Sequence, residues 1–160
     1  MFKGAGYLLE IFSKTDIKGR KKIQKIVFIL ENDGMDAPYK YSYHHYGPYS
    51  AQLQEEIDFL VQHNLLEEIT KNGTYEYKIT DEGRKFSKQI KKGQEVAVND
   101  DLLLKLNNES PQFLEMLSTY IFLLESGYEK ESARNKAVDL KPHLKDLIDQ
   151  AVKYYEQNLN

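Results

Sequence analysis

The stretch that decides the fold reads YGPYSAQLQEEIDFLVQHNLL over residues 46–66. Gly-Pro near its start interrupts the extended segment before it, and Pro48 has the fixed φ that suits the first turn of a new helix. Three apolar residues then recur at the spacing of one helical face: Leu53, Ile57 and Leu60. This spacing predicts a helix that follows the Gly-Pro step and ends at Leu65-Leu66.

The segments on both sides of this helix complete a pattern. Downstream, Asn72-Gly73 separates two β-prone segments, residues 67–70 and 75–80, and therefore predicts a tight hairpin. Upstream, apolar spacing predicts a short helix over residues 7–12 and a longer one between Gly19 and Asn32. Helices followed by a hairpin in this order are typical of a winged helix-turn-helix. The expected fold class is therefore mainly α with a small β-hairpin.

The second half of the chain reads as helical. Residues 91–95 resemble a linker, so we expect a winged-helix domain over residues 1–92 and an α-helical C-terminal extension over residues 98–160. Four helical segments are predicted in the extension, near residues 100–108, 113–124, 133–140 and from Pro142 onward. The extension is expected to pack on the first domain or on a second subunit, which predicts a possible homodimer through residues 99–160.

Composition limits the class of protein. An apolar content of 41% suffices for a packed core, and the 160 residues contain no cysteine. No apolar run reaches the roughly 18 residues of a membrane span, and no signal peptide is recognisable, so we expect a cytoplasmic protein. The net charge of −3 argues mildly against a general nucleic-acid coat, yet residues 1–50 hold eight Lys and Arg against five Asp and Glu.

A cluster of cations begins the predicted second helix. Five positive charges fall within eight residues: Lys18, Arg20, Lys21, Lys22 and Lys25. They are expected to lie largely off the apolar stripe of the helix and to contact phosphates, because clustered cations release counterions when they meet a nucleic-acid backbone. The alternative is an ordinary solvated helix face.

The predicted third helix carries mixed signals. Its early polar residues could hydrogen-bond base edges, as a recognition helix does. Three acids, Glu55, Glu56 and Asp58, follow at once and would repel phosphates, and no Lys or Arg occurs between Tyr49 and Asn64. This shifts weight toward a third helix that is buried or faces a protein. The candidate residues for nucleic-acid or partner binding are Lys18, Arg20, Lys21, Lys22, Lys25, Tyr49, Ser50, Gln52, Gln54 and Lys71.

Tyrosine is concentrated around these elements. Seven of the twelve tyrosines are Tyr39, Tyr41, Tyr43, Tyr46, Tyr49, Tyr75 and Tyr77. They could stack on single-stranded bases, but packing of half-buried strands on helices is the favoured interpretation. His44 and His45 are adjacent and would point to opposite faces of a strand, so no metal site is expected. The motifs of cofactor sites and of nucleophilic catalysis are also missing, which predicts no cofactor and no enzyme.

Two motifs carry a resemblance: GRKKIQKI at residues 19–26 and YHHYGPYS at residues 43–50. Together they resemble the bacterial YwgA-like proteins, which share a G-R-K-K-[IL]-Q-K helix and an F/Y-G-P-Y-S entry to the next helix. The match covers roughly residues 7–90, and Leu140-Lys141-Pro142 extends it into the C-terminal helices. More distantly, the chain is similar to the Panacea (SocA-like) antitoxin domains, which carry a K-L-Q-K-[LI] helix and a Y-G-P motif.

The resemblance implies antitoxin or adaptor roles through protein contact and brings no catalytic residues with it. Gln24 of the first motif is interpreted as architectural, hydrogen-bonding the backbone of the Gly47-Pro48 turn. The expected function is that of a non-enzymatic winged-helix regulator that recognises a macromolecule. DNA, as for a transcriptional regulator, is the first expectation on fold analogy, and an antitoxin-like or adaptor protein-interaction module is the alternative.

Overall fold

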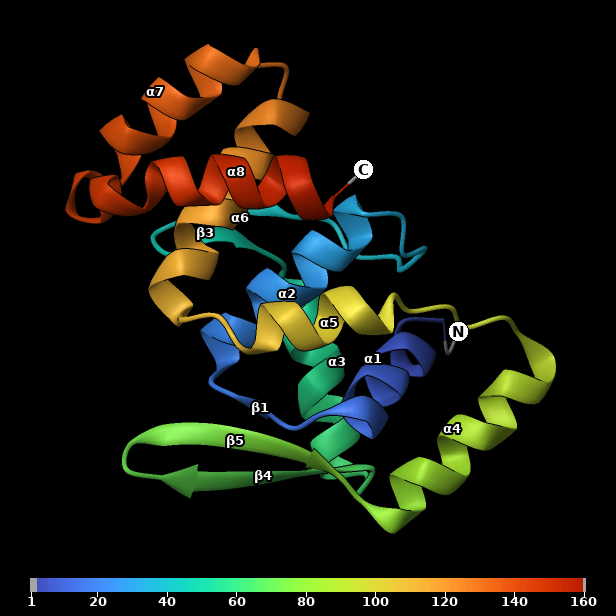
Figure 1. Ribbon diagram of the computed structural model, residues 1–160. Coiled ribbons are helices and arrows are strands. Elements are labelled where there is room, and N and C mark those ends of the chain that lie inside the picture. Colours follow the sequence, from blue (N-terminus) through green and yellow to red (C-terminus); the bar gives the residue numbers. More distant parts are fainter. Residues whose placement is uncertain (1–2, 160) are drawn as a thin grey trace.

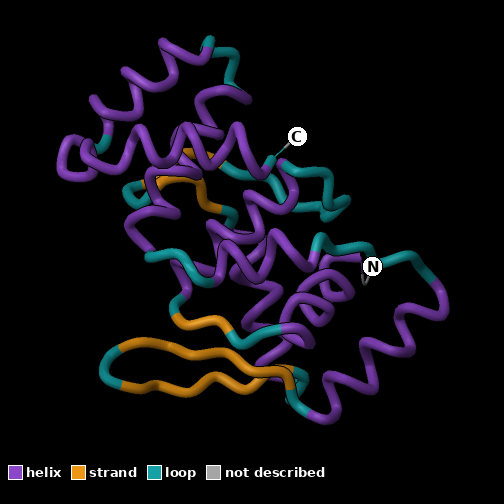
Figure 2. Tube along the Cα trace, in the orientation of Figure 1, coloured by secondary structure: helices purple, strands orange, loops and turns teal. Residues whose placement is uncertain are grey.

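The computed structural model describes residues 3–159, so residues 1, 2 and 160 of the two predicted domains lie outside the described residues. Over these residues the chain is mainly helical, as expected, and it has two small antiparallel sheets where a single hairpin was expected (Figures 1 and 2). The first half contains α1 (Lys3–Lys14), β1 (Ile17–Lys18), α2 (Arg20–Asn32), β2 (Ser42–His44), β3 (Gly47–Tyr49), α3 (Ala51–Gln62), β4 (Leu66–Lys71), β5 (Thr74–Ile79) and α4 (Asp81–Gly93). The second half contains α5 (Asp100–Asn107), α6 (Pro111–Glu125), α7 (Lys130–Leu140), the 3₁₀ helix η1 (Pro142–Leu147) and α8 (Ile148–Asn158).

The hairpin predicted at Asn72-Gly73 is confirmed. β4 and β5 pair antiparallel from Leu66 opposite Ile79 to Lys71 opposite Thr74. Asn72 and Gly73 have φ values of 53° and 78°, the left-handed pair that a two-residue hairpin turn of this twist requires. β1, which the sequence did not predict, adds to the outer side of β5 and gives a three-stranded sheet of order β1-β5-β4.

The Gly-Pro step is a strand and does not open a helix, so that prediction was wrong. Gly47-Pro48-Tyr49 forms β3, and Pro48 lies opposite Tyr43 of β2 in a two-stranded ribbon. Proline is tolerated there because a short ribbon leaves one strand side free of ladder hydrogen bonds. α3 begins at Ala51, where the Ser50 hydroxyl accepts the Leu53 N–H at 3.2 Å as an N-cap.

Several helix ends differ from their predicted positions. α3 ends at Gln62, since Leu66 already belongs to β4, and α4 continues to Gly93, three residues into the expected linker. Pro142 begins the 3₁₀ helix η1, and the α-helix follows only at Ile148. The end of α6 was predicted correctly: Gly127 has φ 102°, and the Tyr128 N–H donates to the Leu123 carbonyl at 3.1 Å.

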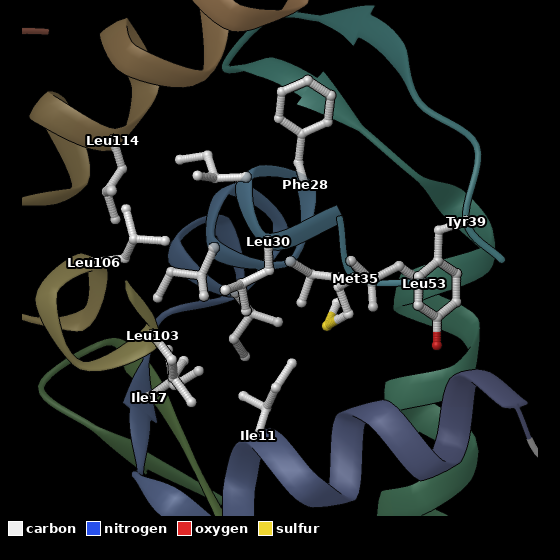
Figure 3. Close-up of a cluster of buried hydrophobic side chains, with 14 of the residues drawn as sticks. Ile11, Ile17, Phe28, Leu30, Met35, Tyr39, Leu53, Leu103, Leu106 and Leu114 are labelled. Atoms are coloured by element: carbon white, nitrogen blue, oxygen red, sulfur yellow. The ribbon is translucent and has the colours of Figure 1, made fainter. Parts of the chain in front are cut away.

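α2 lies at the centre of one continuous core (Figure 3). Its residues 23–30 are buried on all sides, because α5, α6, β3, β1 and α3 all contact this helix. α6 also contacts β3, and α7 and α8 pack on α6 (Figure 1). Within residues 3–159, no helix combines the length and apolar character that crossing a bilayer requires.

The tyrosine-rich segment packs inward. Tyr39 is buried and Tyr41 and Tyr43 are half-buried, while the residues between them are exposed, as in an extended segment with one inward face. The Tyr39 hydroxyl donates to Glu56 and the Tyr41 hydroxyl to Glu31, so these tyrosines fasten α2 and α3 to the segment that joins them. Packing is therefore the role that the structure gives to these three tyrosines.

Candidate binding site around the Gly47 turn

Most of the predicted basic cluster is engaged inside the molecule. Arg20 donates from Nε to the Tyr77 hydroxyl at 2.9 Å, pairs with Glu68 at 3.3 Å and stacks over the ring of Tyr75. Lys22 donates from Nζ to the Asn107 carbonyl at 2.5 Å. These contacts join α2 to the β4–β5 hairpin and to α5.

Lys25 lies deepest, and the expectation that it would lie off the apolar stripe was wrong. It is only 2% exposed, and its Nζ donates to the Pro48 carbonyl at 2.7 Å. A buried ammonium needs such partners, since burying an unpaired charge is costly. The sequence pattern failed here because α2 is surrounded by other elements on every side along residues 23–30.

Glu115 of α6 forms salt bridges with two other lysines. It is 3% exposed, and its carboxylate lies 3.1 Å from Lys21 Nζ and 3.1 Å from Lys141 Nζ. Lys141, also buried, donates in addition to the His45 carbonyl at 2.5 Å. Lys21, Lys25 and Lys141, here called the lysine cluster, thus surround a single carboxylate and leave two positive charges uncompensated.

Burial and charge set the ionisation of this cluster. Burial lowers the pKa of Lys25 to about 8, because the attraction of Glu115 offsets it only in part and Lys21 and Lys141 lower it further. For Glu115, burial would raise the pKa, but hydrogen bonds from Lys141 and Lys21 outweigh it and hold the pKa below its ordinary value. Glu115 is therefore ionised at neutral pH.

Gln24 binds buried backbone as predicted, but at Ser50, two residues after Pro48, and not at Gly47-Pro48 itself. Its side-chain amide donates to the Ser50 carbonyl at 2.9 Å, and its Oε1 accepts the Ser50 N–H at 2.9 Å. Both backbone groups are buried with Ser50, so the side chain replaces a strand partner. The turn itself requires glycine at position 47, where φ is 101° and an added Cβ would lie 3.3 Å from Thr119 Oγ1.

A cavity of about 370 Å³ opens beside this turn, between α2 and the β2–β3 ribbon. We call it the Gly47 pocket. Its lining residues are Arg20, Lys21, Gln24, Lys25, His44, His45, Tyr46, Gly47, Tyr49 and Gln54. Among these described residues there is no Asp or Glu, so the wall is cationic and aromatic.

The structure brings only part of the predicted site together. Five candidate residues line the Gly47 pocket: Arg20, Lys21, Lys25, Tyr49 and Gln54. Ser50 is buried as the cap of α3, whereas Gln52 is exposed on that helix. Lys18 and Lys71 line a different cleft, beside the β4–β5 turn, and Lys22 lies near α5.

Sequence reasoning missed the residues that come from elsewhere. His44, His45 and Tyr46 were examined as metal ligands or packing groups, although they belong to the second motif. Glu115 and Lys141 lie 90 or more residues from Lys25, and nothing local marks them. Leu140-Lys141-Pro142, noted in the resemblance, was the one available signal.

Similarity to a known protein extends over nearly the whole chain. No family model matches it. Uncharacterized protein YwgA of Bacillus subtilis (strain 168) is 31% identical, and the alignment covers 98% of this chain and 97% of the relative. The similarity therefore spans both the Gly47 turn and the helices that supply Glu115 and Lys141.

Proposed function

We propose that this chain, which belongs to the YwgA-like family, is a non-enzymatic recognition protein. It is built on a winged helix, and its macromolecular partner is another protein. The topology of residues 3–93 supports the scaffold. A helix, a short strand, two helices and a hairpin follow one another, and the strands have the order β1-β5-β4. If the scaffold is a winged helix, β4 and β5 are its wing and α3 is its third helix. The β2–β3 ribbon is then an insertion between α2 and α3 (Figure 1).

The exposed surface of α3 favours a protein over DNA as the partner. Glu55 and Asp58 are exposed on it. Phe59, which follows Asp58 and lies about one turn after Glu55, is 43% exposed. No Lys or Arg occurs from Tyr49 to Thr70, so nothing on this helix offsets the acids. Such a face repels phosphates and suits a protein segment that is basic and carries an apolar group for Phe59.

DNA binding is the second candidate, and one observation favours it. Lys18 and Lys71 are exposed and line the cleft beside Asn72 at the turn of the β4–β5 hairpin. A wing of this kind could contact a phosphate backbone. The rest of the basic cluster supports DNA less, because Arg20, Lys21, Lys22 and Lys25 already have partners within the chain.

Two variants separate the candidates. Phe59→Asp changes only the α3 face, and the pair Lys18→Glu with Lys71→Glu, called the wing variant, changes only the cleft between β1 and the tip of the wing. If the partner is a basic protein, crosslinking in the native host should identify a protein that the wild-type chain and the wing variant bind and that Phe59→Asp does not. Binding should weaken with salt.

The DNA measurement uses fluorescence anisotropy with random duplex at low salt. Under the proposal, the affinity is weak and the wing variant changes it little. The opposite result would be salt-dependent DNA binding that is lost in the wing variant and unchanged in Phe59→Asp. That result would establish a DNA-binding regulator.

A further inference from the structure

We infer that the Gly47 pocket binds a nucleotide, with its phosphate on Lys21 and Lys25, the two members of the lysine cluster that line the pocket, and its base beside Tyr46 and Tyr49. A phosphorylated small molecule with an aromatic ring matches the two kinds of group that line this cavity. The inference concerns a different surface from the exposed face of α3 and does not depend on the proposed protein partner.

The cations supply the phosphate subsite. An ammonium has three N–H donors, and the Pro48 carbonyl takes one of those of Lys25. Lys21, at the rim, is paired with Glu115, but Glu115 also receives Lys141, so the cluster retains a surplus of two positive charges. A phosphate would balance a charge that the protein leaves unbalanced at a desolvated site.

The aromatic residues supply the other half of the pocket. Tyr46 is 54% exposed, the largest exposure among the exposed large apolar side chains of the described chain, and Lys21 Nζ lies 4.4 Å from its ring centroid. Tyr49 and His44 form a ring pair with centroids 4.9 Å apart. Any nucleobase can stack on such rings, since every base has a π-face.

The size of the cavity agrees with this class of ligand. About 370 Å³ falls at the lower end of the range for small-molecule sites, which suits one nucleoside monophosphate better than a polymer. The Gly47 turn also brings the backbone close to the cluster, because an added Cβ would lie 3.6 Å from Lys25 Cε.

The test is calorimetric titration of the full chain with three probes: AMP, adenosine and inorganic phosphate. We expect AMP to bind, and adenosine and phosphate each to bind at least about tenfold more weakly, because each lacks half of the contacts. Equal affinity for phosphate and AMP would overturn the nucleotide assignment, and so would the absence of AMP binding at millimolar concentration.

Two variants locate the site. Lys25→Met removes the buried ammonium and keeps the length of the side chain, and Tyr46→Ala removes an exposed ring that the fold does not need. Lys25→Met should weaken AMP and phosphate alike, whereas Tyr46→Ala should weaken AMP and leave phosphate unchanged. The matched controls, Lys92→Met and Tyr128→Ala, alter exposed residues outside the pocket and should bind as the wild type does.

An NMR readout guards against misfolded variants. His44 and His45 line the pocket, and His63 at the end of α3 does not. AMP should shift the ring protons of His44 and His45 and leave those of His63 in place. Shifts confined to His63, or AMP affinity unchanged in both pocket variants with native spectra, would refute the site. Phe59→Asp should retain AMP binding, so failure of this inference is distinguishable from failure of the proposed protein partner.

Discussion

At the scale of single residues, Lys25 shows most clearly how neighbouring groups change the pKa of a side chain. A buried lysine is destabilising unless hydrogen bonds and a nearby carboxylate compensate for lost hydration. Here Pro48 and Glu115 provide that compensation, and the pKa of Lys25 still falls to about 8. The folded protein therefore holds this proton less tightly than the unfolded chain does.

This difference predicts a specific pH dependence of stability. Below pH 8 Lys25 is protonated in both states, so it adds no pH dependence there. Between about pH 8 and 10.5 the unfolded state binds more protons, and the free energy of unfolding of the wild type should rise relative to Lys25→Met. The full difference corresponds to about 3 kcal/mol.

Urea denaturation of both proteins across this pH range measures the effect. Lys92→Met, altered at an exposed lysine, should follow the wild type at every pH. Parallel curves for the wild type and Lys25→Met would mean that Lys25 is hydrated in solution and that its burial has been overestimated.

At the scale of elements, the local patterns succeeded and the non-local ones failed. Asn72-Gly73 predicted its hairpin because two adjacent residues with left-handed φ determine that turn. Gly47-Pro48 misled because β3 depends on pairing with β2 and on packing against α6, neither of which a short window contains. The burial of Lys25 depends in the same way on Glu115.

Half of the candidate site could therefore be predicted. Arg20, Lys21, Lys25, Tyr49 and Gln54 were identified from two stretches of sequence, and the structure places all of them in one cavity. The partners that set their charge are Glu115 of α6 and Lys141, which lies between α7 and η1, and only the folded chain reveals them.

The connection between α2 and the β3–α3 junction offers a test at this scale. Gln24→Ala would leave the buried Ser50 N–H without its partner, while the Ser50 carbonyl would keep only the Gln54 N–H at 3.3 Å, and this should lower the free energy of unfolding by roughly 1–3 kcal/mol. Gln54→Ala is the control, since Gln54 is half-buried and bonds only to the exposed Asp58. Thermal or urea unfolding compares the two. Equal losses would show that water replaces Gln24 at the junction.

At the scale of the whole molecule, the helices after residue 98 share the core of the first half. Leu103 of α5 is fully buried near α2, and Leu114 of α6 lies on the same core (Figure 3). The apolar stripes that suggested a partner subunit are thus covered within one chain. The homodimer through residues 99–160 stays a prediction, and its remaining apolar contacts would be exposed residues such as Leu104 and Tyr128.

Adjacent leucines in α5 test this arrangement. Leu103→Ala should cost about 2–5 kcal/mol of stability through the cavity it leaves, because Leu103 is 0% exposed. Leu104→Ala changes a side chain that is 47% exposed and should alter stability by no more than about 0.5 kcal/mol. A similar cost for both in urea unfolding would contradict the shared core.

Sedimentation velocity of the same proteins addresses assembly. If a dimer forms through α5, Leu104→Ala should shift it toward monomer while Leu103→Ala, when folded, should not. A wild-type chain that sediments as a monomer near 18.7 kDa across micromolar concentrations would exclude the dimer at those concentrations.

The bond from Lys141 to the His45 carbonyl also has a consequence for the order of events during synthesis. The chain grows from its N-terminus, so Lys25 and the Gly47 turn emerge long before the residues that complete their surroundings. At about 5–20 residues per second, Lys141 is added roughly 6 to 23 seconds after Lys25. A nascent chain therefore carries an unfinished lysine cluster for most of its translation, and only a chain translated past η1 can assemble it.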